Sequence, residues 1–301
     1  MKTYSIDNGN LRAVFLSYGA ILHELWVKDN KGLERNVIQG LPKAEDYLND
    51  EWSRGAVIGR FAGRLENPIL IEGERVSIEH QKGVLLHSGP KGWNKQEWEI
   101  EGSPETDRIC FSYTCPKGTA GFPGTVKAKI IYQLKGNRLC INYHATTDAP
   151  THINLTNHAY FNLASELPIN HHELKINADK KLELKENLVP KGTMMNVNNT
   201  AFDFINSKEI KNIRMDDYFV LNETDQPAAT LYSPISGIEM TTYTDQPGMV
   251  VFTPPHFDGI CFETQKFSNT PNVPSFPSTL VRPEENYSQS THYVFTLKNE
   301  D

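Results

Sequence analysis

The sequence predicts an all-β protein, a large antiparallel β-sandwich, and three observations support this prediction. Apolar and polar residues alternate in several segments, turn residues separate these segments, and no window sustains the three-to-four-residue apolar spacing of a helix. Such alternation is typical of strands that bury one face, whereas a βαβ protein would need helices between its strands. No linker, charge block or repeat divides the chain, so we expect one domain over residues 1–301.

The clearest strands are predicted at residues 125–134 (TVKAKIIYQL) and 138–146 (RLCINYHAT), where every second side chain is apolar or aromatic. Gly136 and Asn137 between them suit a two-residue hairpin turn, because both residues tolerate positive φ. One short helix is expected at residues 43–50. Further strands are expected at residues 11–27, 107–115, 172–178, 181–185, 229–233, 238–244 and 291–298.

Composition and charge exclude several classes of protein. The formal net charge is −7, with no dense cluster of Lys and Arg, which argues against nucleic acid or an anionic membrane as a partner. No run approaches the roughly 18 apolar residues of a membrane span, and the N-terminus does not resemble a signal peptide. The four cysteines show no CxxC spacing, so we expect free thiols and a cytoplasmic location.

Two segments near residue 75 combine glycine with residues that suit a sugar site. GRFAGRLENP (59–68) holds two arginines four residues apart, and a guanidinium can donate paired hydrogen bonds to hydroxyl groups. Surface ion pairs are the alternative. LLHSGPKGWN (85–94) places His87 in a Gly/Pro-rich loop that ends in Trp93, whose aromatic face would suit a pyranose. A purely structural histidine is the alternative there.

The segment THINLTNHAYFNL (151–163) is unusually polar for a strand. If it formed one continuous strand, its alternate residues from His152 to Asn162 would line one face, and a core would not tolerate such a stripe without partners. His152 and His158 lie six residues apart, which is not a recognised metal-ligand spacing, so we expect no metal. The run His171-His172-Glu173 is expected to face solvent rather than to bind a metal.

Carboxylates in two later segments are further candidates. In RMDDYFVL (214–221), the paired Asp216 and Asp217 precede an apolar run, as at a turn or a sheet edge. In GICFETQ (259–265), Glu263 lies among apolar residues. An apolar setting raises the pKa of a carboxyl group toward the working range of a general base.

Taken together and in order, these segments resemble the aldose 1-epimerase (galactose mutarotase) family. GRFAGRL, LHSGPKGWNKQEW and GFPG resemble family segments, NLTNHAYFNL is close to the family signature, and ETQKFSNTPNVPSFPSTLVRP is similar to its last motif. The motifs span about residues 55–295. The sequence departs from the family pattern at Gly63, where Asn is common, at Ser88, where Gly is common, and in the runs around 214–217 and 255–257.

The resemblance implies a β-sandwich with a carbohydrate cleft and a role for each matching residue. Glu263 would be the base that takes the proton of the C1 hydroxyl, and His158 the acid that protonates the ring oxygen. His87 would help to hold and polarise the ring oxygen. Arg64 and Asp216 would bind sugar hydroxyls, with Asp217 the alternative to Asp216. The C1–O5 bond would open to the aldehyde and reclose as the other anomer, so no cofactor is expected.

Three other functions stay open beside a free monosaccharide substrate of the galactose or glucose type. A hexose-6-phosphate 1-epimerase would need a basic pocket, for which Arg54, Arg60 and Lys91 are available. A silent sugar-binding protein on the same fold would have lost the acid–base pair. A glycoside hydrolase would need two carboxylates flanking the bond, which leaves both histidines unexplained. The sequence favours neither a monomer nor a homodimer.

Overall fold

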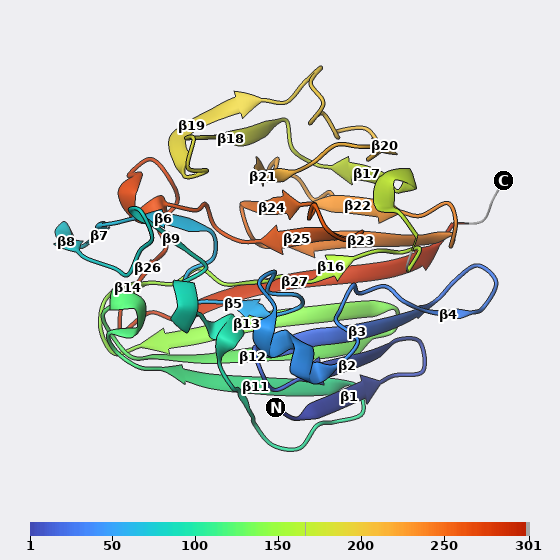
Figure 1. Ribbon diagram of the computed structural model, residues 1–301, viewed down its shortest axis with the longest axis horizontal. Coiled ribbons are helices and arrows are strands. Elements are labelled where there is room, and N and C mark those ends of the chain that lie inside the picture. The colour runs from blue at the N-terminus through green and yellow to red at the C-terminus, as the bar shows by residue number, and fades with distance from the viewer. Residues whose placement is uncertain (166, 299–301) are drawn as a thin grey trace.

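The computed structural model describes residues 1–165 and 167–298, and it is built from antiparallel sheets (Figure 1). The all-β prediction is therefore confirmed. The largest sheet holds, in spatial order, β10 (Glu99–Ile100), β11 (Arg108–Cys115), β12 (Val126–Lys135), β13 (Arg138–Thr147), β27 (Tyr287–Leu297), β23 (Ile238–Thr244), β22 (Ala229–Tyr232), β17 (Glu173–Ile176) and β20 (Lys208–Glu209).

Two smaller sheets accompany it. The first holds β1 (Thr3–Asp7), β2 (Arg12–Leu16), β3 (Ile21–Lys28) and β4 (Glu34–Asn36). The second, here called the site sheet, holds, in spatial order, β16 (Tyr160–Phe161), β25 (Ile260–Thr264), β24 (Gly248–Phe252), β21 (Asp216–Val220), β18 (Lys180–Leu184) and β19 (Pro190–Asn196).

Short strand pairs and 3₁₀ turns connect the sheets. The pairs are β5 (Val57–Ile58) with β15 (Thr156–Asn157), β6 (Arg64–Glu66) with β9 (Val84–Leu86), β7 (Ile69–Ile71) with β8 (Glu74–Val76), and β14 (Thr151–His152) with β26 (Leu280–Val281). The 3₁₀ turns are η1 (Ala44–Asn49), η2 (Gly89–Lys91), η3 (Trp93–Lys95), η4 (Thr119–Gly121), η5 (Ile169–His171) and η6 (Thr270–Asn272).

The alternation in the sequence is the reason that the longest strands form. Along β12 every second residue from Val126 to Leu134 is apolar or aromatic and buried, and the residues between them are exposed or half-buried. β12 and β13 pair in register from Val126 with Thr147 to Lys135 with Arg138, and Gly136 turns the chain with φ 58°. The hairpin expected at residues 136–137 is therefore confirmed.

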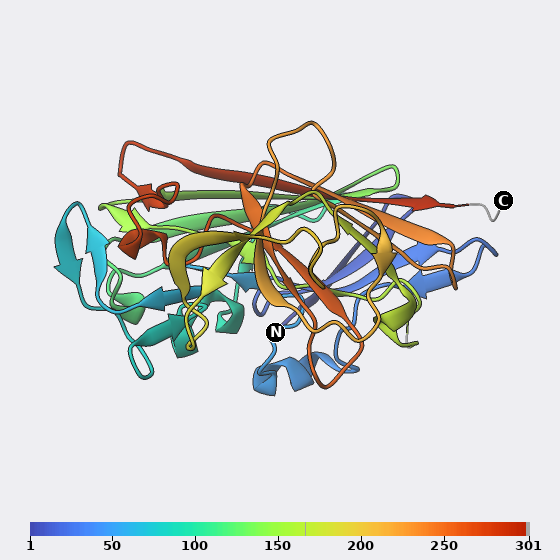
Figure 2. The same cartoon turned by 90° about the horizontal axis from the view of Figure 1, so that it is seen from above.

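Both smaller sheets pack against the largest one. The ring of Phe15 on β2 lies 4.6 Å from that of Tyr132 on β12, and the ring of Phe161 on β16 lies 4.9 Å from that of Tyr293 on β27. A buried apolar cluster runs continuously through all three sheets. Seen from above in Figure 2, the long strands β12, β13 and β27 form one layer, and the first sheet lies on one side of it. This packing is the sandwich that the sequence predicts.

Three local expectations need correction. Residues 151–163 do not form one strand; they form β14, β15 and β16 with breaks between them, so no single polar face exists. Residues 11–27 form β2 and β3, separated by a turn at Gly19 and Ala20, where φ is positive. The expected helix at 43–50 is the 3₁₀ turn η1. Among the described residues, no helix is long and apolar enough to cross a membrane.

Candidate active site

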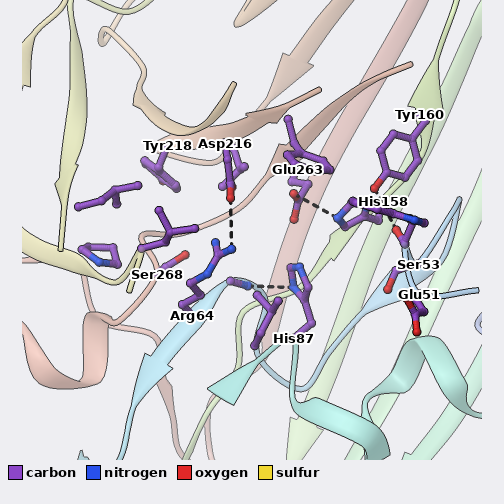
Figure 3. Close-up of a pocket in the computed structure, with 18 of the residues that line it drawn as sticks. Glu51, Ser53, Arg64, His87, His158, Tyr160, Asp216, Tyr218, Glu263 and Ser268 are labelled. Carbon is purple, nitrogen blue, oxygen red and sulfur yellow. Dashed lines mark hydrogen bonds and ion pairs between the residues drawn. The ribbon is translucent and has the colours of Figure 1, made fainter. Parts of the chain in front are cut away.

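A cavity of about 400 Å³ opens between the site sheet and the loops around β6, β9 and β15 (Figure 3). All five residues expected at the site line this cavity: Arg64, His87, His158, Asp216 and Glu263. They come from positions up to about 200 residues apart in the chain, and only the packing of the sheets brings them together. The structure therefore gathers the expected set in one place.

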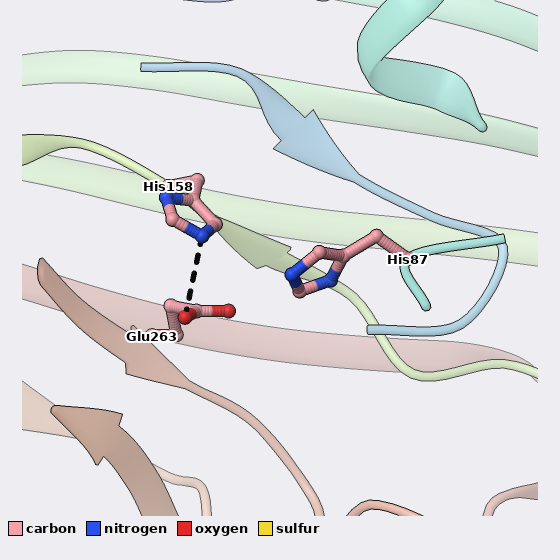
Figure 4. A group of neighbouring side chains, drawn as sticks. All are labelled: His87, His158 and Glu263. Atoms are coloured by element: carbon pink, nitrogen blue, oxygen red, sulfur yellow. Dashed lines mark ion pairs between the residues drawn. The ribbon is translucent and has the colours of Figure 1, made fainter. Parts of the chain in front are cut away.

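A buried acid and a buried base form a pair in the cavity. Nε2 of His158 lies 3.4 Å from Oε1 of Glu263, and the two side chains are 6% and 4% exposed (Figure 4). Glu263 lies on β25, which is buried along its whole length, and Oε2 has no hydrogen-bond partner among the described residues. That orphaned oxygen in the cavity is available to an incoming hydroxyl group.

Burial shifts the pKa values of Glu263 and His158 in opposite directions. The pKa of Glu263 is raised to about 8, mainly by desolvation and also by the nearby charge of Asp216, while the charge of Arg64 opposes the shift. Desolvation lowers the pKa of His158 to about 4. Because both groups lose charge when buried, the pair as a unit holds one mobile proton near neutral pH.

His87 reaches the cavity from a strained loop that follows β9. His87 and Ser88 both adopt positive φ, 50° and 61°, a conformation that costs L-residues on the order of 1–2 kcal/mol each. The loop is held by a hydrogen bond from the backbone N–H of Phe61 to Oγ of Ser88, 2.9 Å long. The His87 ring stands at 87° to the His158 ring, with centroids 5.4 Å apart.

The backbone fixes which nitrogen of His87 carries the proton. The N–H of Gly63 donates to Nδ1 of His87 at 3.2 Å, so Nδ1 is the acceptor and a neutral ring has its proton on Nε2. Burial, together with the positive charge of Arg64, holds the pKa of His87 well below its usual value. His87 thus presents an N–H donor to the cavity.

Arg64 and Asp216 form the polar end of the cavity. Nη2 of Arg64, at the start of β6, lies 3.2 Å from Oδ2 of Asp216, at the start of β21. The side chains are 23% and 35% exposed, so each keeps groups free for a ligand. Asp217 points elsewhere: it is buried against Lys181. Of the two aspartates, Asp216 is the one in the cavity.

Aromatic and apolar side chains form the rest of the wall. Trp52 and Phe252 stack at 17° with centroids 6.1 Å apart, and the Tyr160 hydroxyl donates to the carbonyl of Trp52 at 3.0 Å. Sequence reasoning missed Trp52, Glu51 and Ser53, which line the cavity from the loop before β5. A signal existed in the tryptophan of NDEWSRG, an apolar ring between charged residues.

The ligating atoms of His87, His158 and Glu263 lie within 4.8 Å of one another, which is close enough to test as a metal centre. Histidines that bind metals normally donate the other ring N–H to an acceptor. His87 does the reverse, because Nδ1 accepts from the Gly63 N–H and the proton on Nε2 occupies the position that a metal would need. The donor set fits proton transfer better than metal binding.

Three residues that were singled out in the sequence are buried outside the site. Trp93 is fully buried, so it offers no face to a sugar. His152 is buried, with Nδ1 at 2.8 Å from Oγ1 of Thr279 and Nε2 at 2.8 Å from the Leu70 carbonyl. His172, expected to face solvent, is 1% exposed and accepts from the backbone N–H of Leu163. Packing accounts for all three.

The basic residues that a phosphate pocket would need are also engaged elsewhere. Arg60 is buried and donates to the carbonyls of Pro123 and Gly124. Lys91 pairs with Glu79. Arg54 lies 3.8 Å from Asp50 and stacks on Phe257. Arg64 is the only Lys or Arg among the described residues that line the cavity, alongside the carboxylates of Glu51, Asp216 and Glu263.

Comparison with known proteins agrees with the fold and identifies the family. Residues 2–294 match the family model described as aldose 1-epimerase. The chain is 32% identical to the galactose mutarotases of Sus scrofa and Homo sapiens, over 99% of this chain and 94% of theirs. It is 31% identical to the aldose 1-epimerase of Escherichia coli K12, over 96% and 93%.

Solved structures are similar over the whole chain. The GalM/aldose epimerase homologue from C. elegans superposes with a TM-score of 0.92 at 27% identity, over 99% of both chains. The galactose 1-epimerase from Lactobacillus acidophilus has the same fold, with a TM-score of 0.87 at 24% identity. From the family match over residues 2–294 and the full-length similarity to these relatives, the chain belongs to the aldose 1-epimerase family.

Proposed function

We propose that this protein is an isomerase that interconverts the α and β anomers of a free aldohexose of the galactose or glucose type. The observation that carries the proposal is the buried pair of Glu263 and His158, with Nε2 and Oε1 3.4 Å apart in the cavity. Opening a pyranose needs a base at the C1 hydroxyl and an acid at the ring oxygen, and this pair supplies both.

The protons balance within the pair. In the reactive form, Glu263 is a carboxylate and His158 an imidazolium. Glu263 takes the C1 hydroxyl proton, the C1–O5 bond breaks with its electron pair going to O5, and O5 receives the Nε2 proton of His158. The products are a neutral open-chain aldehyde, a carboxylic acid and a neutral imidazole. Rotation about C1–C2 turns the other carbonyl face toward O5, and the reverse transfers close the ring as the other anomer.

The remaining polar groups would orient the sugar. His87 presents Nε2–H to the ring-oxygen side, and Arg64 and Asp216 bind hydroxyls at the far end of the cavity. The stacked Trp52 and Phe252 offer an apolar surface for the C–H faces of the ring. These transfers balance without a redox or covalent group, so we propose that the enzyme uses neither cofactor nor metal.

The charge of the cavity favours a neutral sugar over a phosphorylated one. The carboxylates of Glu51 and Asp216 repel a phosphate, and the single Lys or Arg of the cavity wall, Arg64, is already paired. A hexose-6-phosphate epimerase would need cations to balance the two negative charges of its substrate. This observation favours the free aldose. A silent sugar-binding protein is disfavoured because the acid–base pair is intact.

Three further expectations belong to this proposal. A buried cluster runs from Ile6 to Phe295, which supports one domain over the whole chain. The four cysteines are free and buried, as suits a reducing cytoplasm. Either a monomer or a homodimer is compatible with the cavity, which is complete within one chain. We infer that the ligand is a monosaccharide, and the net charge of −7 argues against nucleic acid or an anionic membrane as a further partner.

Polarimetry of freshly dissolved α-D-galactose and α-D-glucose tests the function. The wild-type protein should accelerate the change in rotation of at least one sugar. Glu263→Gln and His158→Asn should each lower kcat by on the order of 10²–10⁴. No acceleration by the wild type with either sugar would refute the proposal, and hexose 6-phosphates would be assayed next.

A further inference from the structure

A buried hydroxyl group at the polar end of the cavity has no part in the roles assigned so far. It belongs to Ser268, in the loop between β25 and η6, and this residue is 6% exposed. Ser268 lines the cavity, and in Figure 3 it lies on the side of Arg64 that is away from His158. A buried polar group in the wall of a cavity is a candidate for contact with the ligand.

Gly63 makes room for this hydroxyl group. Oγ of Ser268 occupies the place where a Cβ at position 63 would lie, and Nε2 of Gln265 is 3.3 Å from the same place. Position 63 is one of those at which the sequence departs from the family pattern. With any side chain there, Oγ of Ser268 could not hold its present position. The presence of this hydroxyl group in the cavity therefore depends on the glycine.

The loop that carries Ser268 is fixed on both sides. Before it, the side-chain amide of Asn154 accepts from the backbone N–H of Lys266 at 2.9 Å and donates to the carbonyl of the same residue at 3.0 Å. After it, Oδ1 of Asn269 accepts from the backbone N–H of Glu66 on β6 at 3.1 Å. Because these contacts order the loop before a ligand arrives, binding to Ser268 costs little conformational entropy.

Ser268 keeps hydrogen-bonding capacity for a ligand. A hydroxyl group can donate one hydrogen bond and accept two. Among the described residues, the side-chain partner of Oγ is Gln265, whose Nε2 lies 3.3 Å away. If Oγ accepts from the amide, its proton is left to donate; if the amide is turned and Oγ donates to it, the lone pairs are left to accept. A sugar hydroxyl group can take the complementary role in either case.

We propose that Ser268 is a substrate-binding residue that contacts a hydroxyl group on the C3–C4 side of the sugar ring. The inference rests on the proposed function, which places C1 and the ring oxygen at Glu263 and His158. In a six-membered ring, C3 and C4 lie across from C1 and O5. Their hydroxyl groups therefore reach toward the end of the cavity that Arg64, Asp216 and Ser268 form. Galactose and glucose differ at C4, so this contact also bears on the choice between them.

Removal of the hydroxyl group should weaken binding without slowing the chemical step. Ser268→Ala should raise KM for galactose about three- to tenfold, the loss expected for one neutral hydrogen bond, with kcat within about twofold of the wild type. A contact on the far side of the ring is made in the ground state and the transition state alike, so its loss raises KM. Ser278→Ala is the matched control: it removes an exposed hydroxyl group between β25 and β26, outside the cavity wall, and should leave KM unchanged.

Sugars that lack one hydroxyl group separate a direct contact from a packing effect. The rise in KM caused by Ser268→Ala should disappear with either the 3-deoxy or the 4-deoxy analogue of galactose, because the partner of Ser268 is then already missing. It should persist in full with 2-deoxygalactose, whose missing hydroxyl group lies beside C1. A loss of packing alone would raise KM equally for all of these sugars.

Binding can also be measured without turnover. The analogue 1,5-anhydro-D-galactitol has no C1 hydroxyl group, so its ring cannot open, and calorimetric titration gives its Kd. Ser268→Ala should raise this Kd about three- to tenfold, as it raises KM. Thermal unfolding of each variant shows whether it is folded. If Ser268→Ala does not fold, Ser268→Cys gives the same comparison, because it keeps the shape of the side chain with a weaker donor and acceptor.

Each outcome bears on the proposal. The wild-type KM and Kd in the folded variant overturn it. A rise in KM that persists with both the 3-deoxy and the 4-deoxy sugar, or that disappears with the 2-deoxy sugar instead, also overturns it. If the wild type mutarotates no sugar but binds the anhydro analogue more tightly than Ser268→Ala does, the proposed function fails while the contact with Ser268 stands.

Discussion

Asp216 and Arg64 meet 3.2 Å apart at one end of the cavity, and they act on Glu263 in opposite directions. The negative charge of Asp216 raises the pKa of Glu263, and the positive charge of Arg64 lowers it. The pair is thus both a sugar-binding element and an electrostatic control on the base. It also connects β6 to β21 across 152 residues of sequence.

Neutralising either Asp216 or Arg64 should shift the dependence of kcat/KM on pH. Above a pH of about 8, the Glu263–His158 pair loses its mobile proton and kcat/KM should fall. Asp216→Asn should lower the pKa of Glu263 and so move this fall in kcat/KM, the alkaline limb of the pH profile, to lower pH. Arg64→Gln should raise the pKa of Glu263 and move the alkaline limb to higher pH. Each should also raise KM by about tenfold through lost hydrogen bonds.

The control for this experiment is the neighbouring aspartate. Asp217→Asn breaks a buried ion pair with Lys181 outside the cavity. It should therefore destabilise the fold without shifting the alkaline limb of the pH profile. If Asp216→Asn left KM, kcat and the limb unchanged, Asp216 would have no part in the site.

The burial of Glu263 should also be visible in protein stability. Its pKa is raised from 4.5 to about 8 in the folded state, so folding holds a proton that the unfolded chain releases. The native protein therefore loses stability as pH rises from about 4.5 to 8, by up to about 1.4 kcal/mol per pH unit. The Glu263→Gln variant has no such proton to release, so its stability should not show this decrease between pH 4.5 and 8.

Urea unfolding at pH 5.5 and 7.5 measures this effect. The free energy of unfolding of Glu263→Gln relative to the wild type should increase by about 2 kcal/mol between the two pH values. His158 contributes in the opposite direction, because its lowered pKa makes stability fall from pH 6.5 toward 4, but it is present in both proteins and largely cancels. A difference that does not vary with pH would show that Glu263 titrates normally.

The parts of this molecule that could be predicted from sequence are those set by local pattern. The period-two alternation of β12 and β13 fixes which face is buried, and the hairpin between them follows from Gly136. The five site residues were identified through the family resemblance, and the apolar neighbours of Glu263 predicted its burial and the direction of its pKa shift.

Features that depend on distant packing could not be predicted. Trp93 and His152 look like sugar-site residues in sequence, but the contacts that bury them come from segments far away in the chain. The contact between Cys261 and His158 joins residues 103 positions apart. The choice of Asp216 over Asp217 depends on which face of β21 meets Arg64 and which meets Lys181.

Any side chain at Gly63 should destabilise the protein, because Ser268 occupies the space that its Cβ would need. A Cβ at Gly63 would lie 2.0 Å from Oγ of Ser268, and φ at Gly63 is +80°. Gly63→Ala should therefore lower the melting temperature, with the strained φ alone worth about 1–2 kcal/mol. It should also lower kcat, because the Gly63 N–H orients His87.

The clash and the strain can be separated with a double variant. Ser268→Gly removes the obstacle, so Gly63→Ala in that background should recover part of the lost stability but not the part due to φ. Additive effects of the two substitutions on melting temperature would contradict direct contact between these positions.

The charge of the cavity should decide between free and phosphorylated sugars. Galactose 6-phosphate should give a kcat/KM at least tenfold below that of galactose, since the carboxylates of Glu51 and Asp216 repel the phosphate. Glu51 is the carboxylate that can be changed without touching the acid–base pair or the Arg64–Asp216 contact. Glu51→Gln should bring the ratio of kcat/KM for galactose to kcat/KM for galactose 6-phosphate closer to one. The change should be larger at low ionic strength, where the repulsion is least screened. Glu45→Gln removes the same charge from an exposed position on η1 outside the cavity, and it should leave the ratio unchanged. A ratio near one for the wild-type enzyme would mean that a cation outside the cavity wall reaches the phosphate, and the preference for a neutral sugar would then be wrong.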